Sequence, residues 1–119
     1  MKKVLLVEDD AFIRDIFSIK LTEHGSEVVA VADGTSALKV LHEDVVDVVL
    51  LDMDLPDISG QEILKLMRSD DKLVSLPVIV FTNRDDEDYK TAIATLGVSG
   101  YFIKASTAYD ELYALIDSL

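Results

Sequence analysis

The sequence predicts a single α/β domain over residues 1–119, with a doubly wound parallel sheet covered by helices on both faces. Short apolar runs alternate five times with longer segments of helical spacing. The runs lack polar alternation, which is typical of strands buried on both faces. No Asn-Gly or Asp-Gly pair joins two of them, so no hairpin is expected.

The five strands are the apolar runs themselves, which are short and rich in β-branched or aromatic residues. They are predicted at Val4–Val7, Val28–Val31, Val48–Leu51, Val78–Phe81 and Tyr101–Ile103. Right-handed crossovers between parallel strands leave few topologies. For five strands they favour the order 2-1-3-4-5, with the switch point between the first and third strands.

The first helix carries an apolar stripe from Phe12 to Leu21. Asp10 is expected to cap its start, and Gly25 suits its carboxyl end. The next two helices are predicted from apolar residues at the same spacing. They cover Thr35–Leu41 and Gly60–Met67.

The fourth helix is predicted at Asp86–Leu96, because acidic residues open it and Gly97 follows it. The fifth is predicted at Thr107–Leu119. It starts with a capping-box pattern in which Thr107 would be the N-cap.

The composition excludes several classes of function. Lys and Arg number 11 and Asp and Glu 23, for a net charge of −12, and no basic cluster is present. Binding to nucleic acid or to anionic membranes is therefore not expected. With no Cys there is no disulfide or thiolate site, and the apolar runs are too short to span a bilayer. We expect a cytoplasmic domain.

The residues that follow the strands are the candidates for chemistry, because ligands of such sheets bind beyond the strands' carboxyl ends. They are Glu8, Asp9, Asp52, Thr82 and Lys104. Two carboxylates about 4 Å apart repel by roughly 4 kcal/mol at an effective dielectric constant near 20. Three of them at one edge therefore predict a divalent cation, and all-oxygen donors favour Mg²⁺ or Mn²⁺.

This combination is suited to phosphoryl transfer. A metal ion and the Lys104 ammonium neutralise phosphoryl oxygens, and the Thr82 hydroxyl donates a hydrogen bond. Asp52, between the other strand ends, is the expected nucleophile.

Four motifs in order along the chain resemble those of receiver domains of two-component response regulators, including the chemotaxis regulators. They are Val4–Asp10, Leu50–Gly60, Pro77–Thr82 and Gly97–Lys104. The resemblance covers essentially the whole chain and implies a flavodoxin-like (βα)5 fold. It also implies a signalling domain that catalyses only its own phosphoryl transfer and dephosphorylation, with no output domain attached.

The resemblance implies specific roles at the site. Asp52 would accept a phosphoryl group from a histidine kinase or a histidine phosphotransfer protein. Glu8, Asp9 and Asp52, with the backbone carbonyl of Asp54, would hold Mg²⁺. Thr82 and Lys104 would contact the phosphoryl group.

The resemblance further implies a switch in which Thr82 and Tyr101 move together and change the face over Asp86–Leu119, formed by the fourth helix, fifth strand and fifth helix. An unidentified downstream protein would bind there. Phosphorylation would act as a population shift. Dimerisation of the phosphorylated chain is left open.

The chain departs from the family pattern at three places. Ala105 replaces the usual proline after Lys104, and a cis bond there costs about 3–4 kcal/mol, so a trans peptide is predicted. Asn83 replaces a small residue and is expected to narrow access. Asp54 is an additional acid, and we hypothesise that it pairs with Arg84 over the site and influences attack by water.

The main alternative is a small phosphatase of the haloacid dehalogenase type, with Asp52 as nucleophile and Asp54 as acid/base. The position of this motif on the third strand and the following Leu55-Pro56 argue against it. Tyr109 and Tyr113, four residues apart, suit either a partner-binding patch or packing. His24 and His42 are interpreted as surface residues near helix ends.

Overall fold

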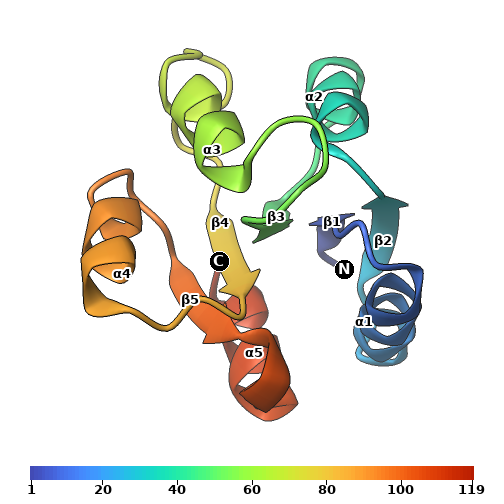
Figure 1. Ribbon diagram of the computed structural model, residues 1–119. Coiled ribbons are helices and arrows are strands. Elements are labelled where there is room, and N and C mark those ends of the chain that lie inside the picture. The colour runs from blue at the N-terminus through green and yellow to red at the C-terminus, as the bar shows by residue number, and fades with distance from the viewer.

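A computed structural model describes residues 1–119 as one parallel sheet between two layers of helices (Figure 1). The strand order is β2-β1-β3-β4-β5, which confirms the predicted topology. The strands are β1 (Lys3–Val7), β2 (Glu27–Val31), β3 (Val48–Asp52), β4 (Val78–Thr82) and β5 (Gly100–Ile103).

Helices cover both faces of the sheet (Figure 1). They are α1 (Ala11–Glu23), α2 (Gly34–Glu43), α3 (Gly60–Arg68), α4 (Glu87–Ala94) and α5 (Tyr109–Ser118), with a 3-10 turn η1 (Lys104–Ser106). The helices α1 and α5 lie on one face, and α2, α3 and α4 lie on the other. None of them has the length and apolar character needed to cross a membrane.

Alternate residues of the central strands enter two separate cores. In β1, Leu5 and Val7 point to the α2–α3–α4 side, and Val4 and Leu6 point to the α1–α5 side. All four are fully buried. Burial on both faces explains why these strands appear in the sequence as uninterrupted apolar runs.

The predicted caps agree with the structure at α1 but not at α5. The Asp10 carboxylate accepts a hydrogen bond from the Ile13 N–H at 3.1 Å, as expected of an N-cap. The predicted capping box of the last helix is wrong, because α5 begins at Tyr109 without a side-chain cap. The turn η1 intervenes, and the Thr107 hydroxyl instead donates to the Ile103 carbonyl at 2.9 Å.

An aromatic column joins α1 to α5. The rings of Phe17 and Phe81 are 5.0 Å apart, and Phe17 also packs on Tyr109 at 5.6 Å. Further out, Tyr113 stacks on His24 at 4.2 Å. The packing interpretation of the two tyrosines of α5 therefore holds, because both are engaged with α1.

Candidate functional site

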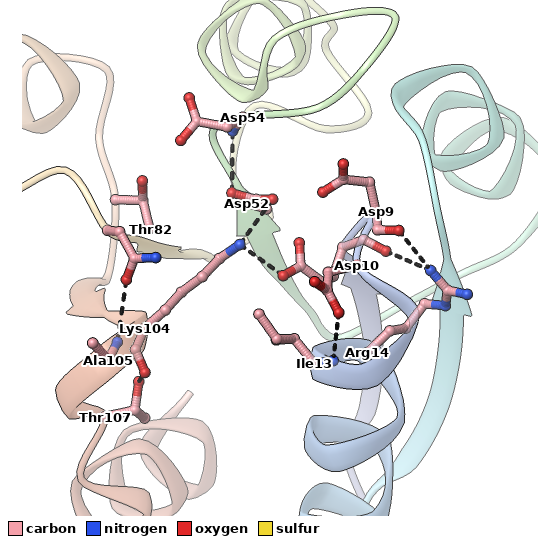
Figure 2. Close-up of polar contacts among 12 residues, drawn as sticks. Asp9, Asp10, Ile13, Arg14, Asp52, Asp54, Thr82, Lys104, Ala105 and Thr107 are labelled. Carbon is pink, nitrogen blue, oxygen red and sulfur yellow. Dashed lines mark hydrogen bonds and ion pairs between the residues drawn. The ribbon is translucent and has the colours of Figure 1, made fainter.

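The sheet register brings the predicted site residues to one edge (Figure 2). Val7 pairs with Leu51, so Glu8 lies beside Asp52, the last residue of β3. On the other side of β3, Thr82 ends β4 opposite Ile103, one residue before Lys104. Five side chains from four strand ends therefore share this edge, as the sequence predicts.

Three carboxylates form the centre of the site. Glu8, Asp9 and Asp52 each offer an oxygen, and these oxygens lie within 4.8 Å of one another. Glu8 and Asp52 are buried, whereas Asp9 is exposed. Glu8 Oε2 is buried without a hydrogen bond, and buried Asp52 Oδ2 has the Lys104 ammonium as its partner. An unpaired oxygen in an all-oxygen cluster fits a hard divalent cation.

Lys104 reaches into this cluster from the end of β5. Its Nζ lies 2.6 Å from Glu8 Oε1 and 3.0 Å from Asp52 Oδ2 (Figure 2). This one ammonium contacts two of the three carboxylates, so the ionised cluster carries an excess of negative charge. That excess is what a bound cation would neutralise.

The buried acids and the lysine perturb each other's ionisation. Burial foremost, and the adjacent Asp52, raise the pKa of Glu8 from 4.5 to about 8, against the lowering effect of Lys104. Burial alone would lower the pKa of Lys104, but its hydrogen bonds to Glu8 and Asp52 outweigh burial and raise it. Without a metal ion, a proton on Glu8 relieves the charge repulsion near neutral pH.

The backbone after β3 contacts the candidate nucleophile directly. The Asp54 N–H donates to Asp52 Oδ1 at 3.1 Å. Gly60, at the start of α3, packs against the Asp52 carbonyl, and a Cβ there would lie 2.7 Å from the Met53 Cα. Glycine is required by this close approach.

The β4–α4 loop is held by both residues of the predicted switch. Thr82 is fully buried, and its Oγ1 accepts from the Arg84 N–H at 3.3 Å. Tyr101 is half-buried, and its hydroxyl donates to the Arg84 carbonyl at 2.7 Å. A displacement of this loop therefore alters contacts of both side chains.

The hypothesised ion pair between Asp54 and Arg84 is wrong. The Arg84 guanidinium instead lies over the ring of Tyr89, 3.7 Å from its centroid, because α4 offers an aromatic face close by. The predicted trans peptide between Lys104 and Ala105 is confirmed, since the chain has no cis peptide bond.

Two supporting contacts could not be read from the sequence. The Asn83 side-chain oxygen accepts from the Ala105 N–H at 3.2 Å, which joins the ends of β4 and β5. Arg14 Nη1 donates to the backbone carbonyls of Glu8 at 2.9 Å and Asp9 at 3.4 Å (Figure 2). The only signal for Arg14 is its place in the first turn of α1.

Comparison with known proteins identifies relatives of this chain. The chain is 39% identical to the sensory transduction protein RegX3 of Mycolicibacterium smegmatis over 116 residues, which are 98% of this chain and 49% of RegX3. It is 36% identical to the chemotaxis protein CheY of Pseudomonas aeruginosa, over 89% of this chain and 86% of that one. The chain therefore spans about half the length of RegX3.

Solved structures agree with the sequence comparison. The receiver domain of the Francisella response regulator 1452 superimposes with a TM-score of 0.91 at 27% identity, covering 99% of this chain and 95% of that chain. The Mn²⁺-bound form of the response regulator Rcp1 superimposes with a TM-score of 0.81 at 27% identity, covering 99% of this chain and 91% of that chain. The family model of the response regulator receiver domain matches residues 4–117. The chain belongs to the response regulator receiver domain family.

Proposed function

We propose that this receiver domain accepts a phosphoryl group on Asp52 from the phosphohistidine of a partner kinase or phosphotransfer protein. The observation that carries the proposal is the buried pair of Glu8 and Asp52, which share the single ammonium of Lys104 while Glu8 Oε2 has no partner. A purely structural cluster would pair every buried carboxylate oxygen, whereas a cation site leaves an oxygen available.

The chemistry follows from the residues at this edge. An Asp52 carboxylate oxygen attacks phosphorus, a P–O bond forms, and the P–N bond to the donor imidazole breaks as that nitrogen takes a proton. Lys104, already beside Asp52, pairs with the new negative charge, and the Thr82 hydroxyl donates to a phosphoryl oxygen. Hydrolysis by water returns free phosphate and Asp52.

The donor set suits Mg²⁺, with Mn²⁺ as a substitute. Glu8, Asp9 and Asp52 would hold the ion together with the backbone carbonyl of Asp54. When bound, the ion neutralises charge on the phosphoryl oxygens during transfer. The Mn²⁺-bound form of Rcp1 supports divalent binding in this fold.

We further propose that phosphorylation acts through Thr82 and Tyr101 on the face of α4, β5 and α5, between Asp86 and Leu119. The shared contact of both side chains with Arg84 supports this route. A downstream protein, or a second phosphorylated copy, would bind to that face. A cytoplasmic location and a single receiver domain over residues 1–119 complete the proposal.

Residues around the phosphoacceptor are proposed to set the lifetime of the phosphorylated state. Asp54 lies beside Asp52, and Asn83 and Arg84 follow Thr82. We expect Asp54→Asn, Asn83→Ala or Arg84→Ala to change the rate of phosphate release at least twofold. A twofold change corresponds to roughly 0.4 kcal/mol in the activation free energy.

Receiver domains are signalling domains, and a phosphatase of the haloacid dehalogenase type is not favoured here. We propose that the only reactions catalysed are transfer to Asp52 and its hydrolysis. Multiple turnover of an aryl phosphate ester would contradict this.

The decisive experiment is incubation with acetyl phosphate and Mg²⁺, followed by intact-mass analysis. Wild-type protein should gain one phosphoryl group, and Asp52→Asn should gain none. Asp54→Asn is the matched control, because it removes a neighbouring carboxylate and should retain the adduct. An adduct on Asp52→Asn, or none on the wild type, would contradict the proposal.

A further inference from the structure

Asp57 is an exposed residue of the β3–α3 loop whose carboxylate is fully engaged by hydrogen bonds. Its Oδ1 accepts from the N–H groups of Gly34 and Ile58, each at 2.8 Å. Its Oδ2 accepts from the Thr35 N–H at 2.9 Å and from the Thr35 hydroxyl at 2.5 Å. These bonds, those to Thr35 and Gly34 foremost, hold the pKa of Asp57 well below its usual range.

Capping of α2 does not by itself explain why the Asp57 carboxylate is bonded to this helix. That helix has its own N-cap, since Asp33 Oδ1 accepts from the Ser36 N–H at 2.7 Å. Asp57 satisfies two other free N–H groups of the first turn from a position 22 residues further along the chain. The additional effect of Asp57 is to join the β3–α3 loop to α2.

The β3–α3 loop also packs closely against the start of α2. Gly34 lies where they meet, and a Cβ at that position would be 2.9 Å from Ile58 Cβ and 3.2 Å from Asp57 Oδ1. Contacts below 3.0 Å are not tolerated, so the loop can lie this close only because residue 34 is glycine.

This loop begins at the phosphoacceptor. The Asp54 N–H donates to Asp52 Oδ1 at 3.1 Å, and at the base of the loop the Gly60 N–H donates to the Met53 carbonyl at 3.0 Å. Residues 55–58 make no other hydrogen bond to a distant segment than those of Asp57. Leu55 and Ile58 pack against the core, and Asp57 supplies the polar contacts that hold this loop to another segment.

We propose that Asp57 is a positioning residue for the phosphoacceptor site, which fixes the β3–α3 loop to the amino end of α2. Anchored in this way, the Asp54 backbone keeps its N–H on Asp52 and its carbonyl at the metal site. The inference rests on the proposed function for the identity of the ion. It adds α2, which holds none of the site residues, to the elements that determine metal affinity.

The coupling must be reciprocal. If the anchored loop favours Mg²⁺, bound Mg²⁺ must favour the anchored loop by the same factor. Mg²⁺ should therefore slow hydrogen exchange of the Gly34 and Thr35 amides in the wild-type protein. Bound Mg²⁺ also stabilises the whole fold, so the slowing at Gly34 and Thr35, which donate to Asp57, should exceed that at Ser36, which donates to Asp33; a purely structural cap would slow all three alike.

The test is a calorimetric titration with Mg²⁺ of the wild type, Asp57→Ala and Asp33→Ala. Both substitutions remove an acidic cap from the same end of α2, but only the first releases the loop. We expect Asp57→Ala to weaken Mg²⁺ binding by about tenfold, the lower range for residues that support metal ligands. Asp33→Ala should remain within about twofold, since the metal ligands keep their support.

The outcomes separate the two proposals. If the wild type binds Mg²⁺ and Asp57→Ala binds it equally well, or if both variants lose affinity equally, the role of Asp57 is refuted. If the wild type takes up no Mg²⁺, the proposed function fails, and this inference fails with it. If Asp57→Ala does not fold, Asp57→Asn takes its place in the titration. The exchange of the Gly34 and Thr35 amides in the wild type, with and without Mg²⁺, tests the same coupling without any substitution. Unchanged exchange in the wild type would refute the coupling.

Discussion

The buried acid Glu8 leads to a prediction about stability. We expect Glu8→Gln to stabilise the metal-free protein near neutral pH. The side chain is fully buried, and burial together with Asp52 raises its pKa to about 8. In the unfolded chain the same carboxyl titrates near 4.5. Folding therefore requires uptake of a proton between these two values.

The size of the effect follows from linkage. Below the unfolded pKa both states hold the proton, and Glu8 has no pH-dependent cost. Between 4.5 and about 8 only the folded state holds it, so the free energy of unfolding falls by about 1.4 kcal/mol per pH unit. At neutral pH the accumulated loss is about 3 kcal/mol, and it levels off above the folded pKa. A permanently neutral Gln avoids this loss.

The assay is urea unfolding followed by far-ultraviolet circular dichroism in the presence of EDTA, at several pH values from the unfolded to the folded pKa. The wild type should become less stable than Glu8→Gln as pH rises, and the two should converge toward pH 4.5. Saturating Mg²⁺ should favour the wild type, because only it keeps the full ligand set. A difference between the proteins that does not depend on pH would refute the reasoning.

Three further substitutions test individual contacts of the structure, each by urea unfolding. Gly60→Ala should destabilise the fold by about 3 kcal/mol, because its Cβ meets the Asp52 carbonyl; a loss below about 0.5 kcal/mol would contradict that close contact. Arg68→Met should cost about 2–3 kcal/mol, since the guanidinium donates to backbone carbonyls of two loops, and Arg68→Lys should recover part of it. Tyr101→Phe should cost about 1 kcal/mol, with faster amide exchange in the β4–α4 loop; an unchanged loop would show that the bond to the Arg84 carbonyl contributes nothing.

The sequence was sufficient for the sheet and for the composition of the site. Strands buried on both faces leave a strong apolar signal, and parallel strands place their carboxyl ends at one edge. Glu8, Asp52 and Lys104 meet there as predicted. Such residues can be located because strand order and register alone determine where they lie.

Features that depend on side-chain conformation could not be predicted. Thr107 matches a capping pattern, but the 3-10 turn after Lys104 directs its hydroxyl to Ile103. Arg84 was expected to pair with Asp54 because of opposite charge, yet it packs on Tyr89. In each case the side chain has more than one partner within reach, and the three-dimensional packing decides between them.

The column of rings between α1 and α5 makes the two helices of the α4–β5–α5 face unequal in how firmly they are packed. Helix α5 buries Leu112 and Ile116 and is further bound to its neighbour through Tyr109 and Tyr113. Helix α4, by contrast, contributes Ile93 as its one fully buried side chain. Shifting α4 exposes far less apolar surface than shifting α5, and so costs less free energy. Within this face, α4 is therefore the helix whose displacement costs less free energy, and α5 the one whose displacement costs more.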